Sequence, residues 1–95
     1  MAEQIQLHAW LGGRVQGIGF RYFVRQQVGA LPITGWVRNV SDGRVELHAE
    51  GERAVLESFL ASIKRGPSGS SVTDVIVDWK PATGLMTNFS IAPTE

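Results

Sequence analysis

The sequence has no cysteine and no long apolar run, and these absences exclude several classes of protein. Without cysteine, neither disulfides nor thiolate-bound metals are available. No apolar stretch approaches the roughly 20 residues that span a bilayer. The first ten residues also lack the basic segment, followed by an apolar one, that is typical of a secretory leader. We therefore expect a cytoplasmic protein with no membrane partner.

Net charge is absent as well, although charge is unevenly distributed along the chain. Residues 1–44 carry a net charge of +3 and residues 45–95 a net charge of −3, so that the total is zero. Binding to nucleic acid requires a strongly basic face, and we expect no such partner. A local site for a small anion in the first half is compatible with this distribution.

The glycine-rich stretch GGRVQGIGFR, residues 12–21, does not contain a nucleotide-binding motif. A phosphate-binding P-loop requires Lys and Ser or Thr after its last glycine, whereas Ile18 and Gly19 follow Gly17. The dinucleotide-binding pattern requires a third glycine three residues after Gly19, where Tyr22 stands instead.

The 95 residues, 43% of them hydrophobic, are enough for one packed domain over residues 1–95. Alternating apolar residues predict strands over residues 5–11, 33–39, 44–51 and 72–79, and a short last strand over 88–92. Helical spacing predicts one helix that starts at Phe20, is weakened by Gly29 and is stopped by Pro32, and a second that opens at Gly51 and Glu52 and ends at Gly66. The expected apolar stripes are Phe20, Phe23, Val24, Val28 and Leu31, then Val55, Leu56, Phe59, Leu60 and Ile63.

The order of these elements predicts a ferredoxin-like βαββαβ fold of the α+β class. We expect a four-stranded antiparallel sheet with two helices on one face, plus a short C-terminal strand. The other face of the sheet should meet solvent and carry His8, Glu46 and His48. Two histidines without a suitable spacing of carboxylates are weak support for a metal site, and we expect no metal.

The turn between the first strand and the first helix is a candidate anion site. Backbone N–H groups at a helix start have no intrahelical partner, and glycines allow successive N–H groups to converge. A cation such as Arg21 is unfavourable at this end of a helix, and a bound anion would remove that penalty. The alternative is that the glycines only make a tight turn and that Arg21 is solvated.

Two motifs in this sequence resemble those of the acylphosphatase family. The first comprises Gly13, Arg14, Val15, Gln16, Gly17, Ile18, Phe20 and Arg21. The second comprises Gly35, Trp36, Val37, Arg38, Asn39, Gly43, Val45 and Gly51. Both stand in the order found in that family, and the length and element order of the chain are also similar to it.

This resemblance implies hydrolysis of the carboxyl–phosphate bond of small acyl phosphates, without metal or cofactor, to give a carboxylate and inorganic phosphate. It implies that Arg21 binds the phosphate and that Asn39 positions the attacking water. The phosphate cradle would consist of Val15, Gln16, Gly17, Ile18, Gly19 and Phe20. From its position alone, Asn39 could instead cap the hairpin at the end of a strand. We expect the enzyme to be a monomer.

Two other functions are compatible with the same fold. One is a non-catalytic module that senses an anion or contacts RNA. However, an anion sensor does not need Asn39, and RNA binding usually requires aromatic residues on the sheet face, where we expect Trp10 at most. The other is a domain that processes carbamoyl phosphate within a larger assembly, as the similar domain of hydrogenase-maturation carbamoyltransferases suggests. The end of this chain near residue 95 favours the free enzyme.

Overall fold

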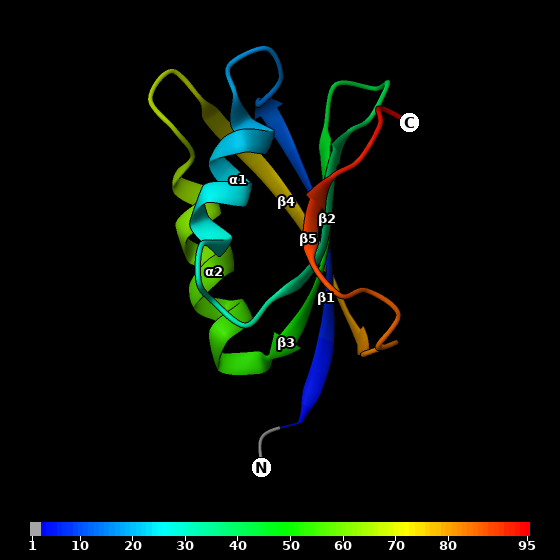
Figure 1. Cartoon of the computed structure of the whole chain (residues 1–95). Coiled ribbons are helices and arrows are strands. Elements are labelled where there is room, and N and C mark those ends of the chain that lie inside the picture. Colours follow the sequence, from blue (N-terminus) through cyan, green and yellow to red (C-terminus); the bar gives the residue numbers. More distant parts are fainter. Residues whose placement is uncertain (1–2) are drawn as a thin grey trace.

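The computed structural model describes residues 3–95, which form five strands and two helices. In chain order these are β1 (Gln4–Arg14), α1 (Phe20–Val28), β2 (Thr34–Asn39), β3 (Val45–Glu52), α2 (Arg53–Arg65), β4 (Ser71–Pro81) and β5 (Phe89–Ile91). The predicted βαββαβ order is confirmed, with a short strand after it. Both helices cover the same face of the sheet (Figure 1).

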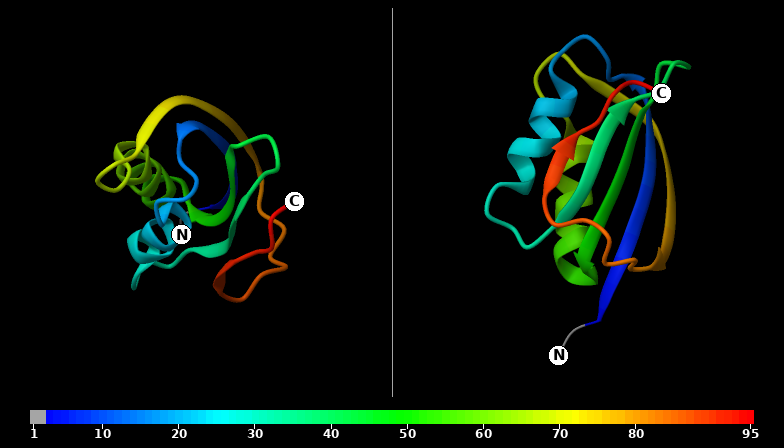
Figure 2. Two further views of the ribbon diagram at one scale, coloured as in Figure 1. Left: turned by 90° about the horizontal axis from the view of Figure 1, so that it is seen from above. Right: turned by 45° about the vertical axis from the view of Figure 1, so that its right-hand side comes forward.

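The strands form one sheet in the order β4-β1-β3-β2-β5. The first four pair antiparallel, as the sequence predicts, whereas β5 pairs parallel to β2 through Gly35↔Phe89 and Val37↔Ile91. The sheet is therefore mixed rather than antiparallel throughout. Figure 2 shows β5 as the edge strand beside β2, while the segment that leads to it crosses from β4 at the opposite edge.

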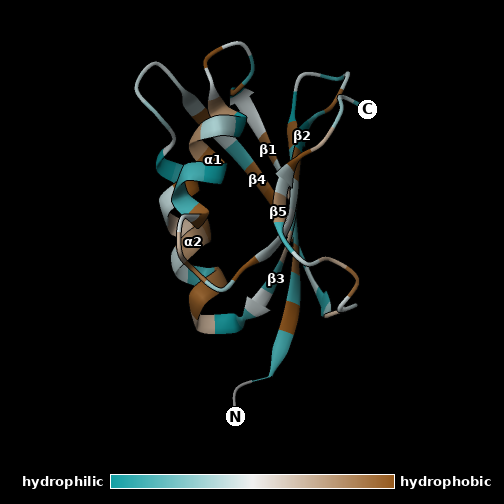
Figure 3. Cartoon of the chain, in the orientation of Figure 1, coloured by the Kyte–Doolittle hydropathy of each residue, from teal (hydrophilic) through white to brown (hydrophobic). Residues whose placement is uncertain are grey.

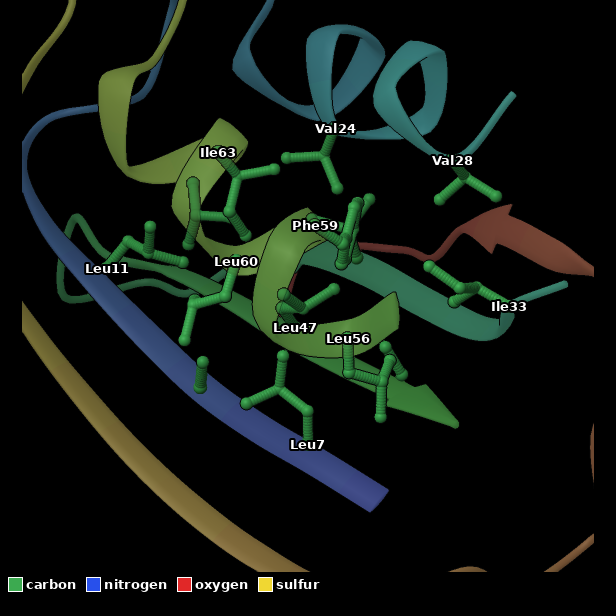
Figure 4. Packing of buried hydrophobic residues seen from close by; sticks show 14 of the residues in the cluster. Leu7, Leu11, Val24, Val28, Ile33, Leu47, Leu56, Phe59, Leu60 and Ile63 are labelled. Carbon is green, nitrogen blue, oxygen red and sulfur yellow. The ribbon is translucent and has the colours of Figure 1, made fainter. Parts of the chain in front are cut away.

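The hydrophobic core lies between the sheet and the helices, and the predicted alternation of the strands is confirmed. Leu7, Ala9 and Leu11 of β1 are fully buried. The apolar sides of both helices face them (Figures 3 and 4). The buried helical residues are Phe20, Val24 and Val28 of α1 and Leu56, Phe59, Leu60 and Ile63 of α2.

Helix α1 is shorter than predicted, because it ends at Val28 and not just before Pro32. Gly29 adopts φ +49 and donates its N–H to the carbonyl of Arg25, which closes the last turn. Leu31 therefore lies beyond the helix and is 42% exposed, so its inclusion in the apolar stripe was wrong. Helix α2 begins at Arg53, one residue after the predicted Glu52, and ends before Gly66 as predicted. Neither helix in the described part of the chain is long and apolar enough to cross a membrane.

The sheet face opposite the helices is not the open polar surface that the sequence predicted. Glu46 and Glu50 are buried, with 7% and 4% of their surface exposed. Glu46 binds His8 and Arg38, whereas Glu50 accepts hydrogen bonds from the crossing segment after β4. Strand alternation assigned these residues to the correct face of the sheet. It gave no information about the side chains and the loop that cover them there.

Candidate active site

The predicted cradle, residues 15–20, connects the end of β1 to the start of α1. Val15 and Phe20 are each only 1% exposed, and their side chains anchor the two ends of the turn in the core. Ile18 packs against the edge of the same core. These three residues can therefore offer a ligand their backbone N–H groups but not their side chains. The turn lies at the same end of the molecule as the β2–β3 turn (Figure 1).

The backbone of this turn alternates in handedness at its two glycines. Gly17 and Gly19 both have φ +77, whereas no residue other than glycine in the described part of the chain has a positive φ. Such alternation directs successive N–H groups to one side of the backbone and forms a concave anion-binding nest. A Cβ atom at either glycine would meet nothing within 4 Å. There is thus room for a larger side chain at both positions. Glycine is needed there because of the positive φ angle, and not because of crowding.

The N–H groups of this turn have no acceptor among residues 3–95. Within residues 3–95, none of the backbone N–H groups from Gln16 to Tyr22 donates a hydrogen bond to another residue, and the first helical bond runs from Phe23 N to Gly19 O at 2.9 Å. Helix α1 also lacks an acidic residue in its first turn and a side-chain cap. The resulting concentration of positive partial charge favours an anion at this position.

Arg21 adds a full positive charge to the same place, in the first turn of α1. Its side chain is half-buried and forms no hydrogen bond or ion pair with any residue between 3 and 95. A guanidinium group can donate two parallel hydrogen bonds to the oxygens of a phosphate. The turn and Arg21 together thus provide the donors and the charge that a tetrahedral anion requires.

The side chain of Gln16 joins this turn to the turn between β2 and β3. Its Nε2 donates to the carbonyl of Val40 at 2.8 Å and to that of Arg44 at 2.9 Å. The sequence predicted only a backbone role for Gln16 in the cradle. No local pattern in the sequence indicates these contacts, because they join residues that are 24 and 28 positions apart.

Asn39 is the last residue of β2 and pairs with Val45 of β3. Its carbonyl accepts a hydrogen bond from Glu95 N at 3.1 Å, whereas its half-buried side chain binds no residue within the described range. The hairpin turn is capped instead by Asp42, whose carboxylate accepts from Arg44 N at 3.0 Å and Arg44 Nε at 2.8 Å. These hydrogen bonds, that of the backbone N–H first, lower the pKa of Asp42. The amide of Asn39 therefore remains available to a ligand or a water molecule.

The histidines lie on the opposite face of the sheet and are not part of this site. His8 Nε2 is 2.6 Å from Glu46 Oε2, and Arg38 binds the other oxygen of that carboxylate at 2.8–2.9 Å. Burial alone would raise the pKa of Glu46, but the hydrogen bonds from His8 and Arg38 outweigh it and lower that pKa. Across residues 3–95, no three side chains of His, Asp or Glu are close enough together to hold a metal ion.

A shallow cavity of about 240 Å³ lies near the start of α2 and contains none of the predicted site residues. It is lined by Glu3, Ile5, Arg53, Trp79, Lys80 and Pro81. The candidate active site is an exposed nest of backbone donors rather than a deep pocket. A search for the largest cavity would therefore not find this site.

Known proteins are similar to this chain over nearly its whole length. A sequence model of the acylphosphatase family matches residues 7–91. An acylphosphatase of Anaeromyxobacter is 44% identical over 96% of this chain and 98% of its own. The crystal structure of Bacillus subtilis acylphosphatase superposes with a TM-score of 0.88 at 42% identity, covering 93% of this chain and 98% of that one. The acylphosphatase structure from Coxiella burnetii has a TM-score of 0.83 at 33% identity, covering 95% and 94%. The family model and the identity over these lengths show that this chain is a member of the acylphosphatase family.

Proposed function

We propose that this enzyme hydrolyses the carboxyl–phosphate bond of acyl phosphates with the turn 15–20, Arg21 and Asn39 as its active site. The observation that carries this proposal is the set of unpaired backbone N–H groups from Gln16 to Tyr22, in the same segment as Arg21, whose guanidinium group has no partner in residues 3–95. Membership of the acylphosphatase family supports the same reaction.

The chemistry of the substrate matches the groups that this site provides. An acyl phosphate is a mixed anhydride whose carboxylate is already a good leaving group, so the reaction needs no strong general acid. Catalysis then depends on neutralising the phosphoryl oxygens and aligning a water molecule with phosphorus. The backbone N–H groups and Arg21 neutralise the oxygens, and their fixed positions favour the charge distribution of the transition state.

Asn39 is the group that we propose for orienting the water. Its amide offers both an acceptor and donors, and its side chain has no hydrogen-bond partner among the described residues. A carboxylate at the same position would repel the phosphate. Water attacks phosphorus, the bond from phosphorus to the carboxyl oxygen breaks, and the products are a carboxylate and inorganic phosphate. The substrate phosphate itself is a candidate acceptor for the proton of the water.

A role in binding nucleic acid is less well supported than hydrolysis. The sheet face holds Trp36 as well as Trp10, so the prediction of a single tryptophan there was wrong. However, Trp10 stacks on His8 at 4.0 Å and Arg38 stacks on Trp36 at 4.6 Å, so each ring already has a partner within the protein. We propose that the enzyme acts as a monomer without nucleic acid, and its cytoplasmic localisation stays a prediction.

The direct test is release of inorganic phosphate from benzoyl phosphate by the purified protein. We expect turnover well above the spontaneous rate, an unchanged rate in EDTA, and competitive inhibition by inorganic phosphate. A rate equal to the spontaneous one would contradict the proposed reaction, and a rate that EDTA removes would contradict a site built from Arg21 and backbone donors alone. A sedimentation measurement of the same sample tests the proposed monomer.

A further inference from the structure

From the hydrogen bonds of its side chain, we infer that Gln16 is a positioning residue that sets the distance between the phosphate cradle and Asn39. The inference rests on the proposed function and adds a role for a side chain that does not touch the substrate. Gln16 contributes a backbone N–H to the cradle, while its side chain reaches the β2–β3 turn directly after Asn39. One residue therefore belongs to both halves of the site.

The contacts of Gln16 use both protons of its amide. Val40 and Arg44 each present a carbonyl oxygen, at 2.8 and 2.9 Å from Nε2, and only the NH₂ end of the amide can satisfy two acceptors. The same two residues close the turn, because Val40 N donates to Arg44 O at 2.8 Å. Gln16 thus binds the two residues at the base of the hairpin turn.

Besides its pairing with Val45 of β3, the backbone around Asn39 is held from two sides. On one side Gln16 binds the carbonyl of Val40, the next residue in the chain. On the other side Glu95 N donates to the carbonyl of Asn39, and Ser41 N donates to the carbonyl of Glu95. Of these two supports, only Gln16 comes from the cradle. It is the link that transmits the position of the bound phosphate to the amide that orients the water.

The consequence is a separation between binding and turnover. Replacing Gln16 by Met keeps the length of the side chain but removes both donors, while the backbone N–H groups and Arg21 stay in place. A displacement of about 1 Å in a reacting group can reduce a rate by about 100-fold. We expect Gln16→Met to lower kcat by about 10- to 100-fold and to change inhibition by inorganic phosphate by less than about 3-fold.

A double-mutant cycle with Asn39→Ala tests the inference. If Gln16 acts through Asn39, Gln16→Met should lower kcat strongly in the parent protein and by less than about 2-fold in the Asn39→Ala background. Gln27→Met is the matched control, because Gln27 is a half-buried glutamine of α1 outside the site and should keep the parent kcat. Equal losses in both backgrounds, or a loss of phosphate inhibition that parallels the loss of kcat, would overturn the positioning role.

Two further measurements keep the test decisive. If Gln16→Met does not fold, Gln16→Leu, which is also uncharged and lacks donors, takes its place in the cycle. In the parent protein, NMR couplings across the hydrogen bonds should connect Gln16 Nε2 to the carbonyl carbons of Val40 and Arg44, and their absence would also overturn the inference. If the parent enzyme is active and the two substitutions lower kcat additively, only the positioning role of Gln16 is rejected. If the parent enzyme is inactive, the proposed function itself is rejected.

Discussion

Arg21 stands two residues after Gly19, the left-handed N-cap of α1, in a helix start that has neither an acidic residue nor a side-chain cap. Its charge is of the same sign as the dipole at that end of the helix, so Arg21 should destabilise the free protein. A bound phosphate reverses the sign of this interaction. An arginine at this helix start therefore favours binding of the phosphate but lowers the stability of the free protein.

Replacement of Arg21 by Ala should separate activity from stability. We expect Arg21→Ala to reduce kcat/KM for benzoyl phosphate by about 1,000-fold or more, since arginines that neutralise a transferring phosphoryl group contribute that much. The free energy of unfolding without ligand should rise by about 0.3–1 kcal/mol. Urea denaturation and a phosphate-release assay measure the two effects.

Arg25→Ala is the matched control for Arg21, because Arg25 is an exposed arginine in the last turn of the same helix. There a cation is favourable, so this variant should be slightly less stable and fully active. Equal losses of activity in both variants would indicate that general charge, and not the position of Arg21, is what matters.

Replacement of Asn39 by Ala should lower turnover while leaving phosphate binding intact. A single lost preorganised group reduces kcat by about 100- to 1,000-fold, and inhibition by inorganic phosphate should hardly change. Asn88→Ala, at an exposed asparagine just before β5, is the control for loss of an amide side chain. If inhibition by phosphate disappears together with turnover, Asn39 has a structural role instead.

Replacement of Gly17 by Ala should damage the cradle through its backbone. Because φ is +77 and the surrounding space is empty, the Cβ atom meets no neighbour, and the strain lies in the backbone itself. Either the variant keeps this conformation and loses about 1–2 kcal/mol of stability, or the turn relaxes to another conformation. We expect weaker inhibition by phosphate and lower kcat/KM. Gly84→Ala places the same strain, at φ +69 and also in open space, in the crossing segment after β4. It should lose similar stability but keep its activity, and an equal loss of activity there would argue against a local effect at Gly17.

Glu50 should stabilise the protein in a pH-dependent manner through the crossing segment. Burial alone would raise its pKa, but the N–H groups of Thr83 and Gly84 lower it to about 2 from the ordinary 4.5. Because the pKa in the folded state is below that in the unfolded state, the stabilisation is complete at neutral pH and is lost as the pH falls from 4.5 toward 2.

The variant Glu50→Gln tests this pH dependence. At pH 7 it should lose about 1.5–3 kcal/mol in the free energy of unfolding, as expected for hydrogen bonds to a charged group. Its stability should also fall less steeply in acid than that of the parent protein. Glu57→Gln, at an exposed glutamate of α2, is the control and should follow the parent curve. Parallel curves for Glu50→Gln and the parent would contradict the assigned role of Glu50.

The sequence predicted those parts of the fold that depend on local periodicity. Alternation identified Leu47 and Ala49 as core residues, because every second residue of a strand lies on the same face of the sheet. Both residues are fully buried. Helical spacing also placed Leu31 on the apolar side of α1. That prediction was wrong, because the helix ends before Gly29 and Leu31 lies beyond it. Periodicity indicates which residues could share a face but not where the backbone leaves the helix.

The candidate site was predictable where it consists of consecutive residues. The glycine turn and Arg21 stand together in the sequence, and a helix start has free N–H groups whatever its tertiary context. The bond from Gln16 to Val40 and the cover over Glu50 depend on segments that only the folded chain brings together. For the same reason, the parallel pairing of β5 with β2 could not be derived from a three-residue strand.

The most direct test of the anion cradle is an NMR titration of the protein with inorganic phosphate. The structure predicts that the largest shifts of backbone amides occur between Gln16 and Tyr22, and that Arg21→Ala abolishes them at the same phosphate concentration. Shifts confined to another place, such as the cavity lined by Arg53 and Trp79, or no saturable shift in the turn, would contradict an anion cradle at residues 15–20.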